Sequence, residues 1–309
     1  MITFIFSTFL LFLSNFAVAQ ECPKTKIVKQ GKVTDTQINE VSGLVVGEKY
    51  LWVHNDSGDG PFIYALEKTG EFAGKIEITN AFAKDWEDMT SFFYENKRYF
   101  LIGDTGDNKE RKSSVNFYVI EEPSNFENRE YLYSFTGSYG DLGPKDVEAM
   151  FVDPATNHLI LVTKGRDGYF HWLDSAFPLP NTPETKKNST TSPPVHITFA
   201  SLHSSEWHEI PLSNKDQSKL RTSASVYPQK KQDGSTGNWI VVRNYLSAQM
   251  WYQAPNQDLP TTLAQVACRI PLPMQPQGET LQFSVNGNAL WTISEGTNPN
   301  VYQILVEWE

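Results

Sequence analysis

The stretch His54–Gly60, "HNDSGDG", combines oxygen-bearing side chains with two glycines, a composition typical of calcium-binding loops. An EF-hand needs a glutamate at the twelfth position of its loop. Counted from Asn55, that position is Leu66. Counted from Asp56, the twelfth position is Glu67, but the third falls on a glycine without a ligand atom. The loop is therefore either a turn between two strands or one part of a site that several segments assemble.

A repeat along the chain indicates which segments these are. Short apolar runs rich in Val, Ile, Tyr, Phe and Trp alternate with turn residues, which is typical of an all-β protein. Five of them can be aligned, each with a serine or a glutamate at the start of the first strand: Ser42, Glu87, Glu148, Ser223 and Glu279. Up to three further strands follow in each repeat. Four antiparallel strands repeated in this way predict a five-bladed β-propeller.

Two other architectures remain open. A six-bladed propeller needs a further repeat within Asp167–Leu220, and a two-sheet sandwich would leave the five-fold register unexplained. In the five-bladed arrangement, the outer strand of the third blade is expected at Trp207–Leu212. The last blade lacks a fourth strand, which Lys26–Thr34 can supply, so that the ring closes without free sheet edges.

The ends of the chain predict its compartment and a covalent link. Residues 1–19 read as a signal peptide, because an apolar run is followed by the small-residue pattern "AVA". The protein is then secreted or periplasmic, with a single propeller domain over 20–309 and a Pro/Ser/Thr-rich surface insertion at 178–195. In an exported chain the two cysteines, Cys22 and Cys268, are expected to form a disulfide. The alternative is two unpaired thiols.

The composition of the chain restricts the classes of binding partner. The net charge of −10 argues against nucleic acid, because phosphate binding needs a basic face. Beyond the signal peptide, no segment is apolar enough over a sufficient length to span a membrane. We therefore expect a monomer that binds a small molecule or an extracellular ligand at the mouth of its channel.

The repeat also predicts a metal site. The innermost strands of a propeller line its channel, so the aligned residues gather into one ring: Ser42, Glu87, Glu148, Ser223 and Glu279. Three carboxylates in a narrow channel repel each other, and a hard cation with oxygen ligands relieves that repulsion. Calcium fits such ligands, whereas zinc would prefer Cys or His. The alternative is that these side chains only hold the blades in register through hydrogen bonds.

The second strands end on the same face and predict the rim of this pocket. Their last residues include oxygen-bearing side chains and two cations: Asn55, Asp56, Asp104, Lys164, Arg243 and Glu295. Asp56 and Asp104 are candidate general bases. Lys164 and Arg243 form a basic sector that could hold a phosphate or carboxylate, although Lys164 could instead neutralise Glu148. Asn55 and Glu295 complete the candidate substrate contacts.

The ring resembles that of a known family. The order Ser, Glu, Glu, Ser, Glu, with "SGL" at Ser42, "EAM" at Glu148, "SASVYP" and "GETLQF", is similar to the secreted calcium-activated nucleotidases of the apyrase type. The resemblance implies a five-bladed propeller with one Ca²⁺ in its channel. The chain departs from that family at the nucleotide loops, where it has "HNDSGDG" and "VTKGRDG". It also looks like uncharacterised secreted bacterial propellers with "NDSGD", "DWED" and "GDN" loops.

Two classes of function follow. One is a calcium-dependent hydrolase of phosphoanhydride or phosphoester bonds, in which an acidic rim residue activates water. The other is a binding or scaffold propeller, in which calcium is structural and the rim recognises a glycan, a peptide or a protein. A propeller can host either function, so the decision rests on the site.

Overall fold

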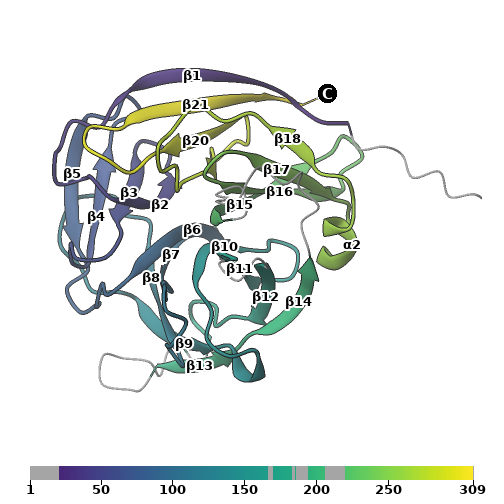
Figure 1. Cartoon of the computed structure of the whole chain (residues 1–309), viewed down its shortest axis with the longest axis horizontal. Coiled ribbons are helices and arrows are strands. Elements are labelled where there is room, and N and C mark those ends of the chain that lie inside the picture. Colours follow the sequence, from purple (N-terminus) through teal and green to yellow (C-terminus); the bar gives the residue numbers. More distant parts are fainter. Residues whose placement is uncertain (1–20, 166–169, 183–184, 186–193, 206–219, 309) are drawn as a thin grey trace, which may run out of the picture.

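The chain forms five sheets arranged radially around a central channel (Figure 1), as a computed structural model shows for residues 21–165, 170–182, 185, 194–205 and 220–308. Each sheet contains a core of antiparallel strands that follow one another from the channel outwards in sequence order, apart from the N-terminal β1, which is the outermost strand of the fifth sheet. The prediction of a five-bladed β-propeller is confirmed. The predicted signal peptide lies outside the described residues.

The five blades have the following strands. The first contains β2 (Val41–Val46), β3 (Leu51–Asn55), β4 (Phe62–Leu66) and β5 (Phe72–Glu77). The second contains β6 (Trp86–Tyr94), β7 (Lys97–Asp104), β8 (Val115–Glu121) and β9 (Tyr133–Ser138). The third contains β10 (Val147–Val152), β11 (His158–Thr163), β12 (Phe170–Ala176) and β14 (Ala200–Ser205). The fourth contains β15 (Arg221–Lys230), β16 (Thr236–Asn244), β17 (Ala248–Gln253) and β18 (Cys268–Ile270). The fifth contains β19 (Gln282–Phe283), β20 (Ala289–Ile293), β21 (Asn300–Glu307) and β1 (Lys24–Lys32).

The N-terminal strand closes the ring, as the sequence predicted. Strand β1 pairs antiparallel with β21, so the first and last strands of the fold lie in one sheet. Their pairing shifts register near Gly31, where the backbone passes close to the first blade. A Cβ at Gly31 would lie 1.9 Å from the carbonyl oxygen of Thr69, so only glycine fits there.

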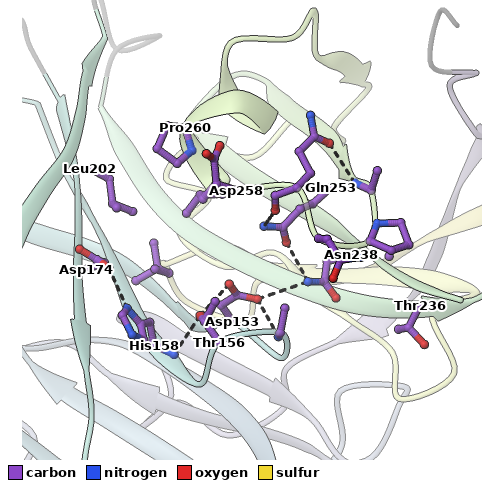
Figure 2. A pocket seen from close by; sticks show the side chains of 18 residues that line it. Asp153, Thr156, His158, Asp174, Leu202, Thr236, Asn238, Gln253, Asp258 and Pro260 are labelled. Atoms are coloured by element: carbon purple, nitrogen blue, oxygen red, sulfur yellow. Dashed lines mark hydrogen bonds and ion pairs between the residues drawn. The ribbon is translucent and has the colours of Figure 1, made fainter. Parts of the chain in front are cut away.

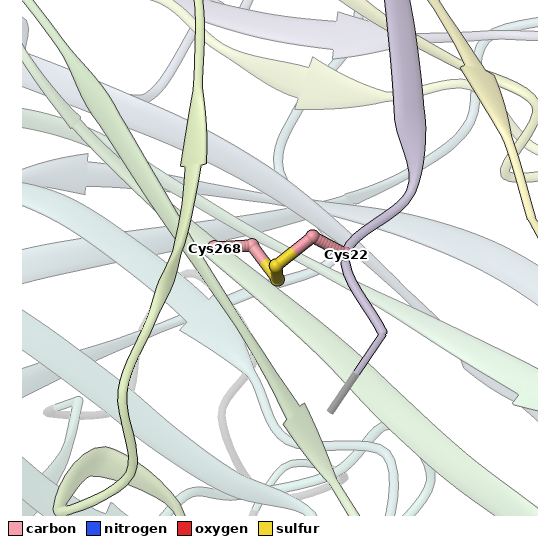
Figure 3. The surroundings of a disulfide bond; sticks show 2 residues. All are labelled: Cys22 and Cys268. Atoms are coloured by element: carbon pink, nitrogen blue, oxygen red, sulfur yellow. A yellow bond between two sulfur atoms is a disulfide. The ribbon is translucent and has the colours of Figure 1, made fainter. Parts of the chain in front are cut away.

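A disulfide fixes this closure. Cys22 precedes β1, and Cys268 begins β18, the outer strand of the fourth blade; Figure 3 shows the bond between them. The two residues are 246 positions apart in sequence, and their Cα atoms are 5.4 Å apart. The predicted pairing is confirmed, and it ties the closing strand to the neighbouring blade.

The third blade departs from the expected boundaries. Its outer strand is β14, whereas the expected segment Trp207–Leu212 lies outside the described residues. The last residue of the predicted insertion begins β13 (Val195–Thr198), which pairs in parallel with β9 and extends the second blade. The described part of Asp167–Leu220 thus supplies strands to two existing blades, and the six-bladed alternative is wrong.

Apolar packing holds the blades together. The buried apolar residues form five clusters, each of which draws on two neighbouring blades. Between the third and fourth blades, for example, the rings of Trp172 and Trp251 meet edge to face with centroids 6.1 Å apart. Burial of such a side chain contributes about 1.5–3 kcal/mol. The short helical segments η1 (Gly140–Leu142) and α2 (Leu259–Leu263) lie in connections between strands. Within the described residues, no helix combines the length and apolarity that a membrane span requires.

We predict that removing the disulfide with Cys22→Ser and Cys268→Ser lowers the free energy of unfolding by up to about 5 kcal/mol, because a long closed loop is released in the unfolded chain. Chemical denaturation of the double variant measures this loss. Labelling of the denatured, non-reduced wild type should detect no thiol, and two labelled cysteines would contradict the bond.

Candidate metal and catalytic site at the channel mouth

Irregular strand pairing positions the predicted ring. In three inner strands the register slips by one residue where a ring residue stands: at Ser42 in β2, Glu87 in β6 and Glu148 in β10. Such a bulge leaves one residue without a partner in the ladder and re-aims its side chain. The sequence therefore places the three residues at equivalent, non-paired positions at the start of their strands.

The fourth blade corrects one ring assignment. Its register slips between Arg221 and Ser223, so the residue equivalent to Ser42 is Thr222. The Thr222 hydroxyl donates to the carbonyl oxygen of Gly278 at 3.1 Å, just as Ser42 donates to a carbonyl of the next blade. Ser223 instead accepts a hydrogen bond from the backbone N–H of Leu281. The bulge shifts the ring position by one residue, and an apolar pattern alone does not reveal that shift.

Ring residues from the two neighbouring blades converge on Ser42. Its hydroxyl donates to the carbonyl oxygen of Glu87 at 2.6 Å and lies 3.4 Å from that residue's Oε2. The same hydroxyl lies 3.5 Å from Oε2 of Glu279. On the other side, carboxylate oxygens of Glu87, Asp146 and Glu148 lie within 4.8 Å of one another. The three ring glutamates are all at most 4% exposed, so they belong to a buried acidic cluster.

Burial makes these carboxylates difficult to ionise. It raises the pKa of both Glu87 and Glu148, and the neighbouring glutamates raise them further. Lys164 offsets part of this charge through an ion pair with Glu148. Burial alone would lower the pKa of Lys164, but the surrounding glutamates raise it above its ordinary value. Tyr245, which the sequence analysis missed, donates its hydroxyl to Oε1 of Glu279 at 2.9 Å.

The opening loop forms one side of the rim. Asn55 is buried and holds the loop: its amide donates to the carbonyl of Gln37 and to Asp59, and its Oδ1 accepts the N–H of Glu40. Asp56 is half-buried, and burial near other acids raises its pKa to about 6. Carboxylate oxygens of Asp56, Asp85 and Glu87 lie within 4.8 Å of one another. Asp56 is therefore both near the ring and accessible from outside.

His54 lies behind this loop and serves packing. It is fully buried, its ring meets that of Trp86 at 5.4 Å, and burial lowers its pKa to about 4. A Cβ at Gly43 would lie 2.0 Å from its Nε2, so the glycine of "SGL" makes room for the imidazole. His54 is consequently neutral at pH 7 and belongs to the core.

The "GDTGDN" loop forms another side. Asp104 is 3% exposed and accepts the N–H of Asp85 at 3.0 Å, and burial raises its pKa. Lys112, a cation that the sequence analysis did not place at the rim, donates to Asp85 at 3.0 Å and lies 4.0 Å from Asp104. Its side chain is 22% exposed. Asp104 thus supports the loop from below, and Lys112 reaches the surface.

The remaining predicted contacts differ in their access to the mouth. Arg243 is fully buried, and its guanidinium donates to Gln275, Thr280 and Thr292, with further bonds to backbone oxygens. It therefore joins the fourth and fifth blades beneath the rim. Glu295 is half-buried, and burial together with the nearby Glu279 raises its pKa to about 8. Lys164 and Arg243, the two cations predicted to hold substrate, are therefore both engaged by other groups of the protein.

Asp88 locks three inner strands together directly below the ring. It is 1% exposed, and its carboxylate accepts the N–H groups of Met89 and Met150, both at 2.8 Å. The N–H of Ala224 is a third donor, and burial nevertheless raises the pKa of Asp88. These bonds join the strands that carry Glu87, Glu148 and Thr222. The "DWED" motif therefore supplies one ring ligand candidate and one positioning residue.

The chain is similar to other proteins only at the level of the fold, and its function has to be inferred from the site. No protein family and no curated protein sequence matches this chain. Among solved structures, it is similar to Raptor of Chaetomium thermophilum (8% identity, TM-score 0.43, covering 91% of this chain and 29% of that one). It is also similar to glutaminyl cyclase of Myxococcus xanthus, with 10% identity and a TM-score of 0.45 over 92% of this chain and 97% of that one. A glucose dehydrogenase has 9% identity and a TM-score of 0.47 over 90% of this chain and 98% of that one. The chain spans less than a third of Raptor.

We predict that Asp88→Ala lowers the free energy of unfolding by about 3 kcal/mol or more, because three buried N–H groups lose their acceptor. Urea denaturation measures the loss. Asp141→Ala, at an exposed position, is the matched control and should change stability by about 0.5 kcal/mol or less. Equal stability of the two variants would show that Asp88 does not lock the strands.

Proposed function

We propose that the channel mouth binds Ca²⁺ and hydrolyses a phosphoanhydride or phosphoester bond. The observation that carries this proposal is the convergence of Glu87 and Glu279, from the second and fifth blades, on the hydroxyl of Ser42 in the first, within 3.5 Å. Buried carboxylates that meet without an equal number of cations favour a bound metal ion. The ligand candidates are Ser42, Glu87, Glu148, Glu279 and, in the fourth blade, Thr222 in place of Ser223.

The donors and their charge fit this ion. All ring side chains offer oxygen, the donor that calcium prefers, and the ring has no sulfur or imidazole donor of the kind that zinc prefers. The three ring glutamates and the neighbouring Asp146 carry four negative charges when ionised, and Lys164 neutralises one of them through Glu148. One Ca²⁺ would offset two of the remaining three charges.

The rim supplies the groups that hydrolysis needs. Bound Ca²⁺ would polarise a phosphoryl oxygen of the substrate. Asp56 is the best placed of the two base candidates, because it is accessible and lies beside Glu87, whereas Asp104 is covered. It would accept the proton of the attacking water. Lys112, together with Glu295 at the rim, replaces Arg243 and the buried Asn55 as the group that we assign to substrate.

The contacts of Lys164 and Arg243 within the protein favour a second candidate function, a binding propeller in which the metal ion is structural. Lys164 pairs with Glu148, and Arg243 is buried among protein acceptors. Because neither predicted cation is free to hold a phosphate, the rim suits a glycan or a peptide better than a polyphosphate. The two candidates share the metal site and differ only in turnover.

Calcium should raise the melting temperature, and Glu148→Gln should remove most of that increase because a neutral amide is a weaker ligand of the same shape. Differential scanning calorimetry with calcium and with a chelator measures the increase. Glu71→Gln, at an exposed position, is the matched control. A melting temperature that calcium does not change, together with no metal by elemental analysis, would contradict the site.

The same increase should depend on pH. Burial raises the pKa of Glu87 and Glu148, so the metal-free folded state binds protons that the unfolded chain has released. Its stability is highest below the ordinary carboxyl pKa and falls as pH rises towards the raised values. Because bound calcium removes that loss, the difference in melting temperature should grow from about pH 5 to about pH 8. A difference that shrinks over this range would contradict the assignment of these ligands.

For the reaction, Asp56→Asn should lower turnover by roughly 10²–10⁴-fold, the usual contribution of a general base, while the melting temperature stays close to that of the wild type. The assay follows phosphate release from nucleotides and from bis(p-nitrophenyl) phosphate in calcium. Asp141→Asn is the control and should retain full activity. If the calcium-loaded protein turns over none of these substrates, the binding propeller is the better assignment.

A further inference from the structure

A cavity lies between the third and fourth blades, at the opposite ends of the inner strands from the acidic ring. Its volume is about 460 Å³, within the range of small-molecule sites. One wall comes from the turn between β10 and β11 and from β12, and the other from β16, β17 and α2. Glu148 begins β10, whereas the cavity residue Asp153 directly follows its last residue. The cavity is therefore separate from the channel mouth.

A chain of hydrogen bonds joins the two walls. The amide of Asn238 donates to Asp153 at 3.3 Å and to Gln253 at 2.8 Å, and Gln253 donates to the carbonyl of Gln257 at 3.0 Å. Asp153, Asn238 and Gln253 are each at most 5% exposed. Figure 2 shows this chain on one side of the cavity. Because buried polar groups linked in this way are held rigidly, this part of the lining keeps its shape without a ligand.

The charge of the lining selects the ligand. Figure 2 shows the pair of His158 and Asp174 on the other side, with Nδ1 2.7 Å from the carboxylate. With Asp153 and Asp258, the lining has three carboxylates and one histidine, and no Lys or Arg among the described lining residues. Its net charge is negative whether or not the histidine is protonated. Such a lining repels anions and attracts cations.

The residues of the lining also restrict which class of cation can bind. Among the described residues, the acidic groups that converge closely enough for a metal ion lie at the channel mouth and not here. No Phe, Tyr or Trp lines the cavity, so the aromatic cage that binds quaternary ammonium groups is missing from the described lining. Aliphatic surface is present instead, from Ile160, Leu202, Leu259 and Pro260. An ammonium group with N–H donors and an aliphatic body matches this combination.

We propose that the cavity between the third and fourth blades binds a small primary amine. The ammonium group is held by the carboxylates of Asp174 and Asp258, and the aliphatic part lies against Leu202 and Leu259. His158 orients Asp174 through their hydrogen bond. This site does not depend on calcium or on the reaction at the channel mouth.

Titration calorimetry of the purified full-length protein in calcium tests this site with 1,5-diaminopentane as the probe. We expect saturable binding of the diamine, binding of 1,5-pentanediol at least 10-fold weaker, and no binding of glutarate. Asp174→Asn combined with Asp258→Asn should weaken diamine binding at least 10-fold. Asparagine keeps the hydrogen bond to His158 and can still cap α2, where Asp258 accepts the N–H of Thr261.

Two controls separate this site from other acidic surface. Asp141→Asn combined with Glu71→Gln removes two exposed charges and should leave the dissociation constant of the diamine within twofold. Thr236→Trp, at the exposed edge of the cavity, should block binding while every carboxylate remains. The proposal is overturned if the wild type shows no saturable diamine binding, if pentanediol binds equally well, or if both cavity variants bind like the wild type.

Discussion

The molecule depends on keeping several carboxylates close together in a buried channel. Glu87, Glu148 and Glu279 come from separate blades, and their mutual repulsion favours opening of the ring. Opening is opposed by the pairing of β1 with β21 and by the disulfide that ties β1 to the fourth blade. Closure and the acidic cluster are therefore linked energetically: a cation that relieves the repulsion also favours the closed ring.

The inner strands show how the fold brings these acids together without breaking the sheets. In four of the five blades, a bulge leaves the ring residue without a partner in the ladder and re-aims its side chain, and pairing resumes at the next residue. Asp88 then joins three of these strands through backbone N–H groups. The carboxylate oxygens of Asp88 accept hydrogen bonds from backbone N–H groups and not from side chains. Asp88 therefore fixes the position of the strands and leaves the side chains of the ring available for a ligand.

Much of this arrangement could be predicted from sequence because it depends on periodicity. Alternating apolar residues predicted the strands, and the five-fold register predicted the closing strand and the positions of the ring glutamates. Thr222 could not be predicted, because a bulge changes register without changing the apolar pattern. Tyr245 and Lys112 were missed for another reason: their loops fold back over the mouth, and only the tertiary structure brings them to Glu279 and Asp85.

The direction of a side chain at a strand end is the other property that a repeat does not encode. Lys164 and Arg243 both follow second strands, yet Lys164 turns to a ring glutamate and Arg243 points between two blades. For Arg243 the cause is Gly278, since a Cβ there would lie 2.0 Å from its guanidinium. A small residue in the next blade thus decides that this cation supports the fold. The same comparison explains why charge at the mouth must be counted from contacts: Lys164 and Arg243 both count as cations in the sequence, yet both are engaged by groups of the protein itself.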